Sequence, residues 1–459
     1  MHYSPQRYAF HLDYLPSLEK FPRKIFLGIR ISGYLCPLKM GSQRGTYPRK
    51  MSETRSRTLE KMYLMRKSSP LFISATLGML TAFGPFVTDF YLPVLPEMAG
   101  HFHTSPTWVS MSLTCGMIGL AAGQLFIGPL TDKWGRQHIL TGSMVLFAIS
   151  SLLCIFATDI IMFNIARLFQ GIAGAGGIVI SKSMATDWHH GQELARFMAM
   201  LAAVNAVAPI CAPVLGGVMS AVTNWQGIFA LLLCIGLVLT LFCALLPESL
   251  PVEKRIRRRI TTLYANLFRV FTNRTFSLCT CSQMLCHFTL FGYIAASPFI
   301  LQQTYGLSPL YYSLCFALNA VALCSGSVLA AAFKRVETAL RIAAVSMVCT
   351  TACLSLCLSM SLPLAVVMVF YVLTLLGFGL IQPGLMATAM DAERSRAGAA
   401  SAIYGASAFV AGAVVSPLVT LGRMEVTSGL IMTAGAIGCL VCVLLLCRKG
   451  GVSRKNYKQ

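Results

Sequence analysis

Long apolar stretches alternate with short polar ones from about residue 70 to the end of the chain. Each apolar stretch is about 20 residues or longer, which is the length that an α-helix needs to cross a bilayer. The pattern therefore predicts an all-α membrane protein with twelve transmembrane helices. Their approximate bounds are 70–94, 106–127, 138–157, 160–183, 196–221, 227–246, 275–302, 309–333, 339–361, 363–388, 397–420 and 427–447.

Basic residues gather in every second connection between these stretches. The only Lys or Arg in the connections after odd-numbered stretches is Arg423. Those after even-numbered stretches contain Lys133, Arg136, Arg196, Lys254, Arg255, Arg257, Arg258, Arg259, Lys334, Arg335, Arg394 and Arg396. Because loops rich in Lys and Arg stay on the cytoplasmic side, both termini are predicted to be cytoplasmic.

A longer connection at 247–274 separates two blocks of six stretches. We predict two six-helix bundles, 70–246 and 275–447, joined by a cytoplasmic linker and arranged as parallel repeats. Residues 1–69 contain fourteen Lys or Arg and four Asp or Glu, with no spanning run. They are predicted to form a disordered cytoplasmic extension, unless translation starts at Met51, Met62 or Met65. Residues 448–459 form a basic cytoplasmic tail.

The composition excludes several classes of protein. The chain is 56% hydrophobic and 12% charged, far from a soluble domain. Its net charge is +21, but from residue 70 onward the basic residues fall in short clusters between apolar stretches and form no basic surface, so no nucleic-acid partner is expected. Cys349, Cys353 and Cys357 share a helical face, but no histidine or carboxylate joins them, which favours packing over a metal site. No ATP-binding glycine loop is present, and no cofactor is expected.

Asp89 is the one acidic side chain near the middle of a predicted span. A charge at that depth costs about 2.5–3.5 kcal/mol and is usually functional. Burial favours the neutral form of a carboxyl group, so Asp89 is expected to take up and release protons. Arg167, in the fourth span, is the expected electrostatic partner. Alternatively, Asp89 lies hydrated near the outer end of its span.

A short charged turn separates the second and third spans. Gly128 and Gly135 permit close helix approach and unusual backbone angles, Asp132 suits a helix start, and Lys133 and Arg136 mark the cytoplasmic face. The alternative is a plain anchoring loop.

The fifth span contains two prolines four residues apart, Pro209 and Pro213, followed by Gly216 and Gly217. The prolines remove backbone donors and are expected to bend the helix. Such a bend is either a hinge in a moving bundle or a static kink.

Polar side chains in otherwise apolar spans are candidates for a substrate cavity. With Asp89, these candidates are Tyr91, Asn205, Gln283, Tyr293, Asn319 and Gln382. Each could instead satisfy a neighbouring helix. His287 is a further candidate for proton transfer, although a lone histidine in a helix is more often a packed hydrogen-bond partner.

These motifs resemble those of the major facilitator superfamily. The resemblance lies in 128–136 for the loop between helices two and three, 167–174 for the fourth helix, and 209–217 for the antiporter motif. More narrowly, 88–93, 297–299 and 397–402 resemble the Bcr/CflA group of drug/proton antiporters. The sequence departs from the group at Gln226, Gly384 and Ala408, which puts the substrate range in doubt.

The resemblance implies a bacterial inner-membrane transporter in which the two halves rock around a central site. Asp89 and Arg167 would couple proton movement to transport, and Asp132 would face the start of the eleventh helix. The predicted function is proton-coupled efflux of small lipophilic or amphiphilic compounds by a monomer, and the alternative is transport of a metabolite or nutrient. An enzyme would need a cluster of catalytic groups. The one cluster that resembles this, Asp187, His189, His190 and Glu193, lies in an ordinary charged loop, so no enzymatic activity is predicted.

Overall fold

A computed structural model of the chain describes residues 69–255 and 267–448. The predicted N-terminal extension, the question of the start codon, the middle of the 247–274 linker and most of the C-terminal tail lie outside the described residues. Within the described residues, twelve helical segments are long and apolar enough to cross a membrane. The twelve predicted spans are therefore confirmed.

The first span is broken in three places and is followed by five long helices. Its pieces are α2 (Pro70–Thr81), α3 (Phe83–Asp89), the short 3-10 helix η2 (Leu92–Val94) and α4 (Leu95–His101). The helices that follow in this first half are α5 (Pro106–Trp134), α6 (Arg136–Ile155), α7 (Ile160–Trp188), α8 (Gly191–Ser220) and α9 (Trp225–Leu245).

The second half repeats the count of six spans. Its long helices are α11 (Arg274–Phe299, continued by a π-helix, η5, Ile300–Thr304), α12 (Pro309–Leu329), α13 (Val336–Ser359), α14 (Leu364–Ala392), α15 (Ala397–Val419) and α16 (Met424–Arg448). Short 3-10 turns lie at η3 (Val252–Lys254), η4 (Phe268–Thr272), η6 (Ala330–Ala332) and η7 (Arg394–Arg396).

The charged turn is much shorter than predicted. Helix α5 runs through Pro129 to Trp134, and α6 begins at Arg136, so most of 128–137 is helical. Only Gly135 is non-helical, with φ at +100°. A side chain is strained at that angle, and a Cβ would lie 2.3 Å from Glu248 Oε2. The prediction of a loop was wrong because a proline near the last turns of a helix need not end it.

Each half is held together mainly by contacts among its own helices. In the first half α5 packs on α7, and α6 packs on both α7 and α9; in the second, α11 packs on α16 and α12 on α14. Helices α5 and α7 approach each other closely, since a Cβ on Gly171 would lie 2.1 Å from the Gly116 carbonyl oxygen, and α12 and α14 approach more closely still, since a Cβ on Gly379 would lie 1.9 Å from the Leu323 carbonyl oxygen. Small residues of this kind let membrane helices pack backbone to backbone.

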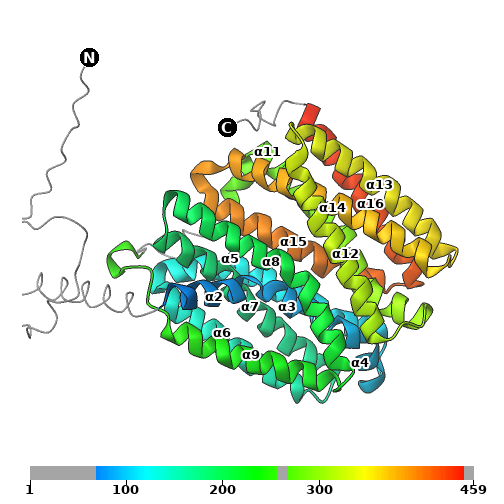
Figure 1. Ribbon diagram of the computed structural model, residues 1–459, viewed down its shortest axis with the longest axis horizontal. Helices are drawn as coiled ribbons and strands as arrows, with labels where there is room; N and C mark the ends of the chain where they lie inside the picture. The colour runs from blue at the N-terminus through cyan, green and yellow to red at the C-terminus, as the bar shows by residue number, and fades with distance from the viewer. Residues whose placement is uncertain (1–68, 256–266, 449–459) are drawn as a thin grey trace, which may run out of the picture. The chain divides into compact units, whose positions relative to one another are not determined.

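Two helix pairs make most of the contacts between the halves. One is α5 with α15, and the other is α8 with α12, which lie side by side in Figure 1. Successive spans run in opposite directions, so their ends fall on two faces. We call the side where Gly135 lies the motif face, and the side where Pro93 and Gln302 lie the far face.

Candidate functional site

Asp89 is the last residue of α3, at the point where the first span breaks. Its side chain is 4% exposed, and its Oδ1 atom has no hydrogen-bond partner. A buried polar atom without a partner is costly, and a functional role is one explanation for such an atom. The expectation of a buried acid is met, and Asp89 lies at a helix break within the span Pro70–His101. The alternative of a hydrated, surface position does not describe this structure.

Arg167, on α7, is completely buried; its two terminal nitrogens bond to neutral groups, and its Nε has no hydrogen-bond partner in the described residues. Its guanidinium donates to the Val87 carbonyl oxygen at 2.6 Å and to Gln170 Oε1. It also lies 4.2 Å from the centroid of the Tyr91 ring, a cation–π contact. The expected ion pair between Arg167 and Asp89 is not formed in the described part of the chain. Arg167 instead anchors the backbone two residues before the acid.

Tyr91 belongs to the same cluster around Arg167. Its side chain is fully buried, and its hydroxyl lies 2.9 Å from Ser112 Oγ. Its ring packs against that of Phe229, with centroids 5.6 Å apart. In this state Tyr91 has no open surface for a substrate, and its predicted binding role stays a prediction.

Three candidates of the second half pair with one another or with neighbouring helices. Asn319 Nδ2 donates to the Tyr293 hydroxyl oxygen at 2.9 Å, and both side chains are buried. Gln283 Oε1 accepts from the Tyr404 hydroxyl at 2.9 Å, which joins α11 to α15. His287 bonds to the Gln283 carbonyl oxygen at 2.8 Å, the packed arrangement that is usual for a lone histidine.

Asn205 and Gln382 are the two candidates with open surface. Asn205 is exposed and Gln382 is half-buried. All of residues 202–207 of α8 are exposed. Six consecutive residues cover every face of an α-helix, so this part of α8 is open both toward lipid and on the opposite side.

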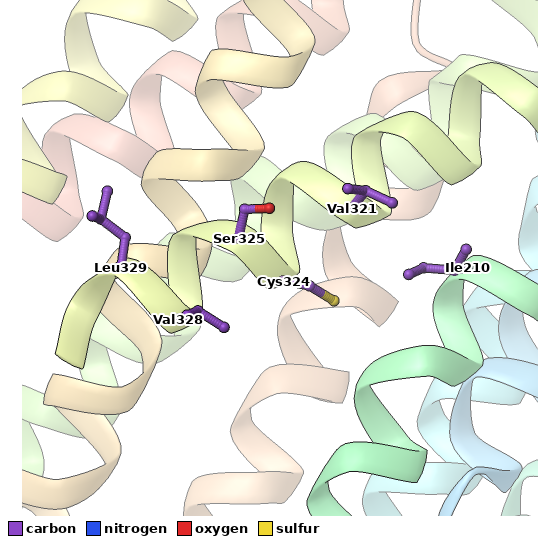
Figure 2. Close-up of a pocket in the computed structure, with 6 residues that line it drawn as sticks. All are labelled: Ile210, Val321, Cys324, Ser325, Val328 and Leu329. Atoms are coloured by element: carbon purple, nitrogen blue, oxygen red, sulfur yellow. The ribbon is translucent and has the colours of Figure 1, made fainter. Parts of the chain in front are cut away.

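An apolar groove of about 420 Å³ lies beside this open part, between α8 and α12. Figure 2 shows Ile210 on α8 across from the α12 side chains that form the other wall. These α12 residues are Val321, Cys324, Ser325, Val328 and Leu329. The groove carries little polar surface, as a path for lipophilic molecules requires.

The far-face part of the same helix pair is closed. A Cβ on Gly216 would lie 2.0 Å from the Phe90 carbonyl oxygen, and one on Gly217 would lie 2.2 Å from Ser313 Oγ. Gln302 Nε2 donates to the Pro93 carbonyl oxygen at 3.0 Å across the two halves. We call this set of contacts the far-face seam. The two glycines of the predicted antiporter motif therefore form the closest contacts of the seam.

The two prolines of that motif do not interrupt the helix. Helix α8 continues through Pro209 and Pro213, and Pro213 is buried. Their proposed role as a hinge stays a prediction.

The motif face of the first half carries a network of charges centred on Arg136. The Arg136 guanidinium forms ion pairs with Asp132, at 2.6 Å, and Asp187, at 3.2 Å. Its backbone N–H donates to Glu248 Oε1 at 2.9 Å, and Glu248 Oε2 pairs with Arg255 at 3.2 Å. The network ties together the ends of α5, α6 and α7 and the segment after α9. It extends the predicted gating motif by three residues that the sequence analysis had left outside it.

The other members of the predicted gating motif are less engaged. Lys133 Nζ lies 5.4 Å from the centroid of the Trp134 ring. A Cβ on Gly128 would approach only Val179, at 3.9 Å. The partner of Asp132 is Arg136, and no hydrogen bond joins Asp132 to the start of α15 within the described residues.

The cluster considered for an enzyme is divided between separate interactions. Asp187 belongs to the Arg136 network and also accepts from Ser249 Oγ at 2.7 Å, whereas His189 pairs with Glu193 at 2.9 Å. Among residues 69–255 and 267–448, no group of three or more His, Cys, Asp or Glu side chains could hold a metal ion.

The comparisons with known proteins agree with this architecture. Residues 72–417 match the model of the Major Facilitator Superfamily. The chain is 35% identical over 374 residues to an uncharacterised MFS-type transporter, YdgK, of Bacillus subtilis, covering 80% of this chain and 93% of that protein. It is 28% identical over 388 residues to a bicyclomycin resistance protein homolog of Haemophilus influenzae, covering 83% and 96%.

Among solved structures, the fold resembles the xylose transporter XylE from E. coli in a partially occluded inward open conformation. The TM-score is 0.65 at 14% identity, and the match covers 85% of this chain and 98% of that one.

The chain belongs to the major facilitator superfamily, and its relatives place it with the Bcr/CflA-type members. It is a multi-pass inner-membrane transporter of small molecules with the two-bundle fold of that family, and not an enzyme.

Proposed function

We propose that this protein exports small lipophilic or amphiphilic compounds in exchange for protons. The observation that carries the proposal is the buried Asp89 carboxyl group, whose Oδ1 atom lacks a partner just before η2, the part of the first span that contacts α12 at the boundary between the two halves. Its proton content changes the charge at that boundary by one unit. A group that is charged in one state and neutral in another can shift a conformational equilibrium.

The relatives support the drug-exporting part of the proposal. One is named a bicyclomycin resistance protein homolog, and another, 26% identical over 51% of this chain, is named a multidrug resistance protein. The apolar groove between α8 and α12 fits a lipophilic cargo. As the halves separate, the transported compound would contact the candidate cavity residues. These are Asn205 and Gln382 at the open surface and the other candidates buried deeper.

The proposed cycle needs no nucleotide. One proton moving down a membrane potential releases about 2.3 kcal/mol per 100 mV. At about 1.4 kcal/mol per tenfold ratio, a potential of about 150 mV sustains a concentration ratio of a few hundred. The Arg136 network would hold the first half together at its motif face as the halves move. The alternation of basic loops favours a cytoplasmic motif face, with both termini on that side.

The test is proton movement in everted membrane vesicles that contain the full chain. Adding ethidium, tetraphenylphosphonium or a neutral lipophilic inhibitor should release protons from acidified wild-type vesicles. Asp89→Asn should abolish that release, because an amide cannot carry the exchanged proton.

Asp159→Asn provides the matched control. Asp159 caps α7 by accepting from the Ile161 and Met162 amides, and asparagine caps equally well, so this variant should behave as wild type. Export that persists unchanged in Asp89→Asn would refute the coupling role. Accumulation of a metabolite inside cells, with no drug-dependent proton release, would favour the alternative of an importer.

A further inference from the structure

The apolar groove between α8 and α12 is long and open. Its α12 wall runs from Val321 to Leu329, which is about 12 Å of helix, and Figure 2 shows the side chains following one another along that helix. Val321 is 47% exposed, Val328 75% and Leu329 44%. Because α12 runs from the far face to the motif face, Val328 and Leu329 lie at the motif-face end of the groove.

The two helices of the groove touch closer to the far face. Gly217 packs against Ser313 in the far-face seam, and Cys324 Sγ lies 3.2 Å from the Ala206 carbonyl oxygen. On the motif-face side of the second contact, the groove is lined by α12 side chains alone. An extended apolar chain lying in the groove would therefore have its outer end at the motif face.

Two exposed cations follow the groove directly. The chain passes from Leu329 through η6 to Lys334 and Arg335, and α13 begins one residue later. Both side chains are exposed, and neither forms an ion pair or a hydrogen bond within residues 69–255 and 267–448. Glu337, in the first turn of α13, is the nearest acid in the sequence and pairs with neither of them. Both positive charges are thus available to an anion.

The facing helix carries a cation at a similar depth. Arg196 is exposed on α8, ten residues before Ala206, which is at the middle of that helix. Ten residues correspond to about 15 Å, and the hydrocarbon core of a bilayer extends about 15 Å from its centre. Cations on both helices therefore lie near the membrane surface at the motif face.

These charges select the molecule that occupies the groove. Hydrophobicity alone does not select it, because lipid tails outside the groove offer the same apolar surroundings. A cationic lipophilic compound would be repelled at the motif-face end. A phospholipid with a net negative head group would be attracted, since its phosphate oxygens accept charge-assisted hydrogen bonds from Lys and Arg.

We propose that the groove binds one acyl chain of an anionic phospholipid from the leaflet at the motif face, with the phosphate on Lys334 and Arg335. The bound chain lies between helices of opposite halves and prevents α8 and α12 from closing on that side. Binding therefore favours the arrangement in which the groove is open. The inference does not depend on proton coupling or drug export, and a transported compound that enters the groove would compete with the lipid.

Photocrosslinking of the full chain in lipid nanodiscs locates the acyl chain. The probe is phosphatidylglycerol with a diazirine in one acyl chain, titrated into phosphatidylcholine nanodiscs, and labelled peptides covering 199–214 and 318–333 are quantified by mass spectrometry. Labelling of both peptides should saturate as the mole fraction of the probe rises. The same diazirine chain on phosphatidylcholine, which has no net charge, should label them about tenfold less or weaker still.

The charge contribution is tested with single substitutions. Lys334→Gln and Arg335→Gln should each raise the mole fraction at half-saturation about fivefold, the equivalent of about 1 kcal/mol per cation. Arg448→Gln is the matched control: Arg448 is exposed at the end of α16, which packs mainly on α11 and α13. Its half-saturation should equal that of the wild type.

The groove itself is tested with the cations intact. Val328→Trp places an indole ring at the motif-face end of the groove and should lower the labelling of both peptides severalfold. Val345→Trp is the control, because Val345 is 49% exposed on α13, outside the groove. This variant should be labelled as the wild type is.

Three results would overturn the lipid site. One is equal labelling by the two head groups, and another is a half-saturation in Lys334→Gln and Arg335→Gln equal to that of Arg448→Gln. The third is the absence of labelling by either probe, as expected if a second copy of the chain covers the groove. Because these measurements need no transport, the lipid site and the proposed drug export stand or fall separately.

Discussion

The regions around Arg167 and Asp89 each contain an ionisable side chain buried in the core of a membrane protein, but they accommodate it in opposite ways. Both terminal nitrogens of Arg167 have partners, a backbone carbonyl and an amide side chain, and an aromatic face lies beside the guanidinium, so that only its Nε is left without a hydrogen bond in the described chain. Asp89, two residues beyond that carbonyl, keeps an oxygen without a partner. A cation that cannot lose its charge must be satisfied permanently, whereas an acid that exchanges a proton has to remain available. The comparison assigns a structural role to the first region and a switching role to the second.

The largest expected effect comes from removing the satisfied charge. Arg167→Leu would leave the Val87 carbonyl and Gln170 without their donor and would lose the contact with the Tyr91 ring. We expect a loss of stability of about 3 kcal/mol or more, since each orphaned buried group costs about 1–3 kcal/mol. Thermal unfolding of the purified protein, followed by size-exclusion chromatography, measures it.

Asp89→Asn is the counterpart in the same assay. It removes a charge that no ion pair compensates within the described residues, so its unfolding temperature should equal or exceed that of the wild type while coupled transport is lost. If Arg167→Leu were as stable as Asp89→Asn, the division into a structural and a switching region would fail.

An intermediate effect is expected at the seam beside Asp89. A Cβ on Gly216 would lie 2.0 Å from the Phe90 carbonyl oxygen, a backbone atom that cannot rotate away. Gly216→Ala should therefore push η2 from α8, at a cost of about 1–3 kcal/mol, and lower the initial rate of export in vesicles by about tenfold or more.

Gly142→Ala is the control for that substitution. A Cβ at Gly142, on α6, meets nothing within 4 Å, so its rate of export should match the wild type. Equal rates for the two variants would mean that the seam need not close tightly for transport.

The smallest effect is expected in the Arg167 region, at Tyr91. Tyr91→Phe loses the hydrogen bond to Ser112 Oγ and should cost about 1 kcal/mol of stability, with no change in the pH dependence of drug-dependent proton release. A double-mutant cycle with Ser112→Ala isolates that bond. A shifted pH dependence would show that the Arg167 region also takes part in switching.

Much of the architecture could be predicted because it depends on properties that each residue carries by itself. The length of an apolar run sets a membrane span, and all twelve runs became helical spans. The end of α5 was misplaced since Pro129 and the charges at 132–133 resemble a loop but are compatible with the last turns of a helix. Of the two glycines expected to have unusual backbone angles, Gly135 has one, whereas Gly128 lies within α5.

The candidate site was predictable only in part, because burial and partners depend on other segments. Asp89 could be found from its charge alone. Tyr91, Tyr293 and Asn319 were chosen for polarity, yet each is buried within its own half. Asp187, Glu248 and Arg255 were not connected to Arg136, although they complete its network.

The sequence by itself determined the number of spans, the family and the one candidate coupling acid. Hydropathy, small-residue motifs and an isolated charge are each properties of a single segment of the sequence. Only the tertiary structure decided that Arg167 bonds to the Val87 carbonyl and not to Asp89, and that Gly217 packs against Ser313 of the second half. Each of these pairings joins helices far apart in the chain, and close packing of the helices brings the partners within reach.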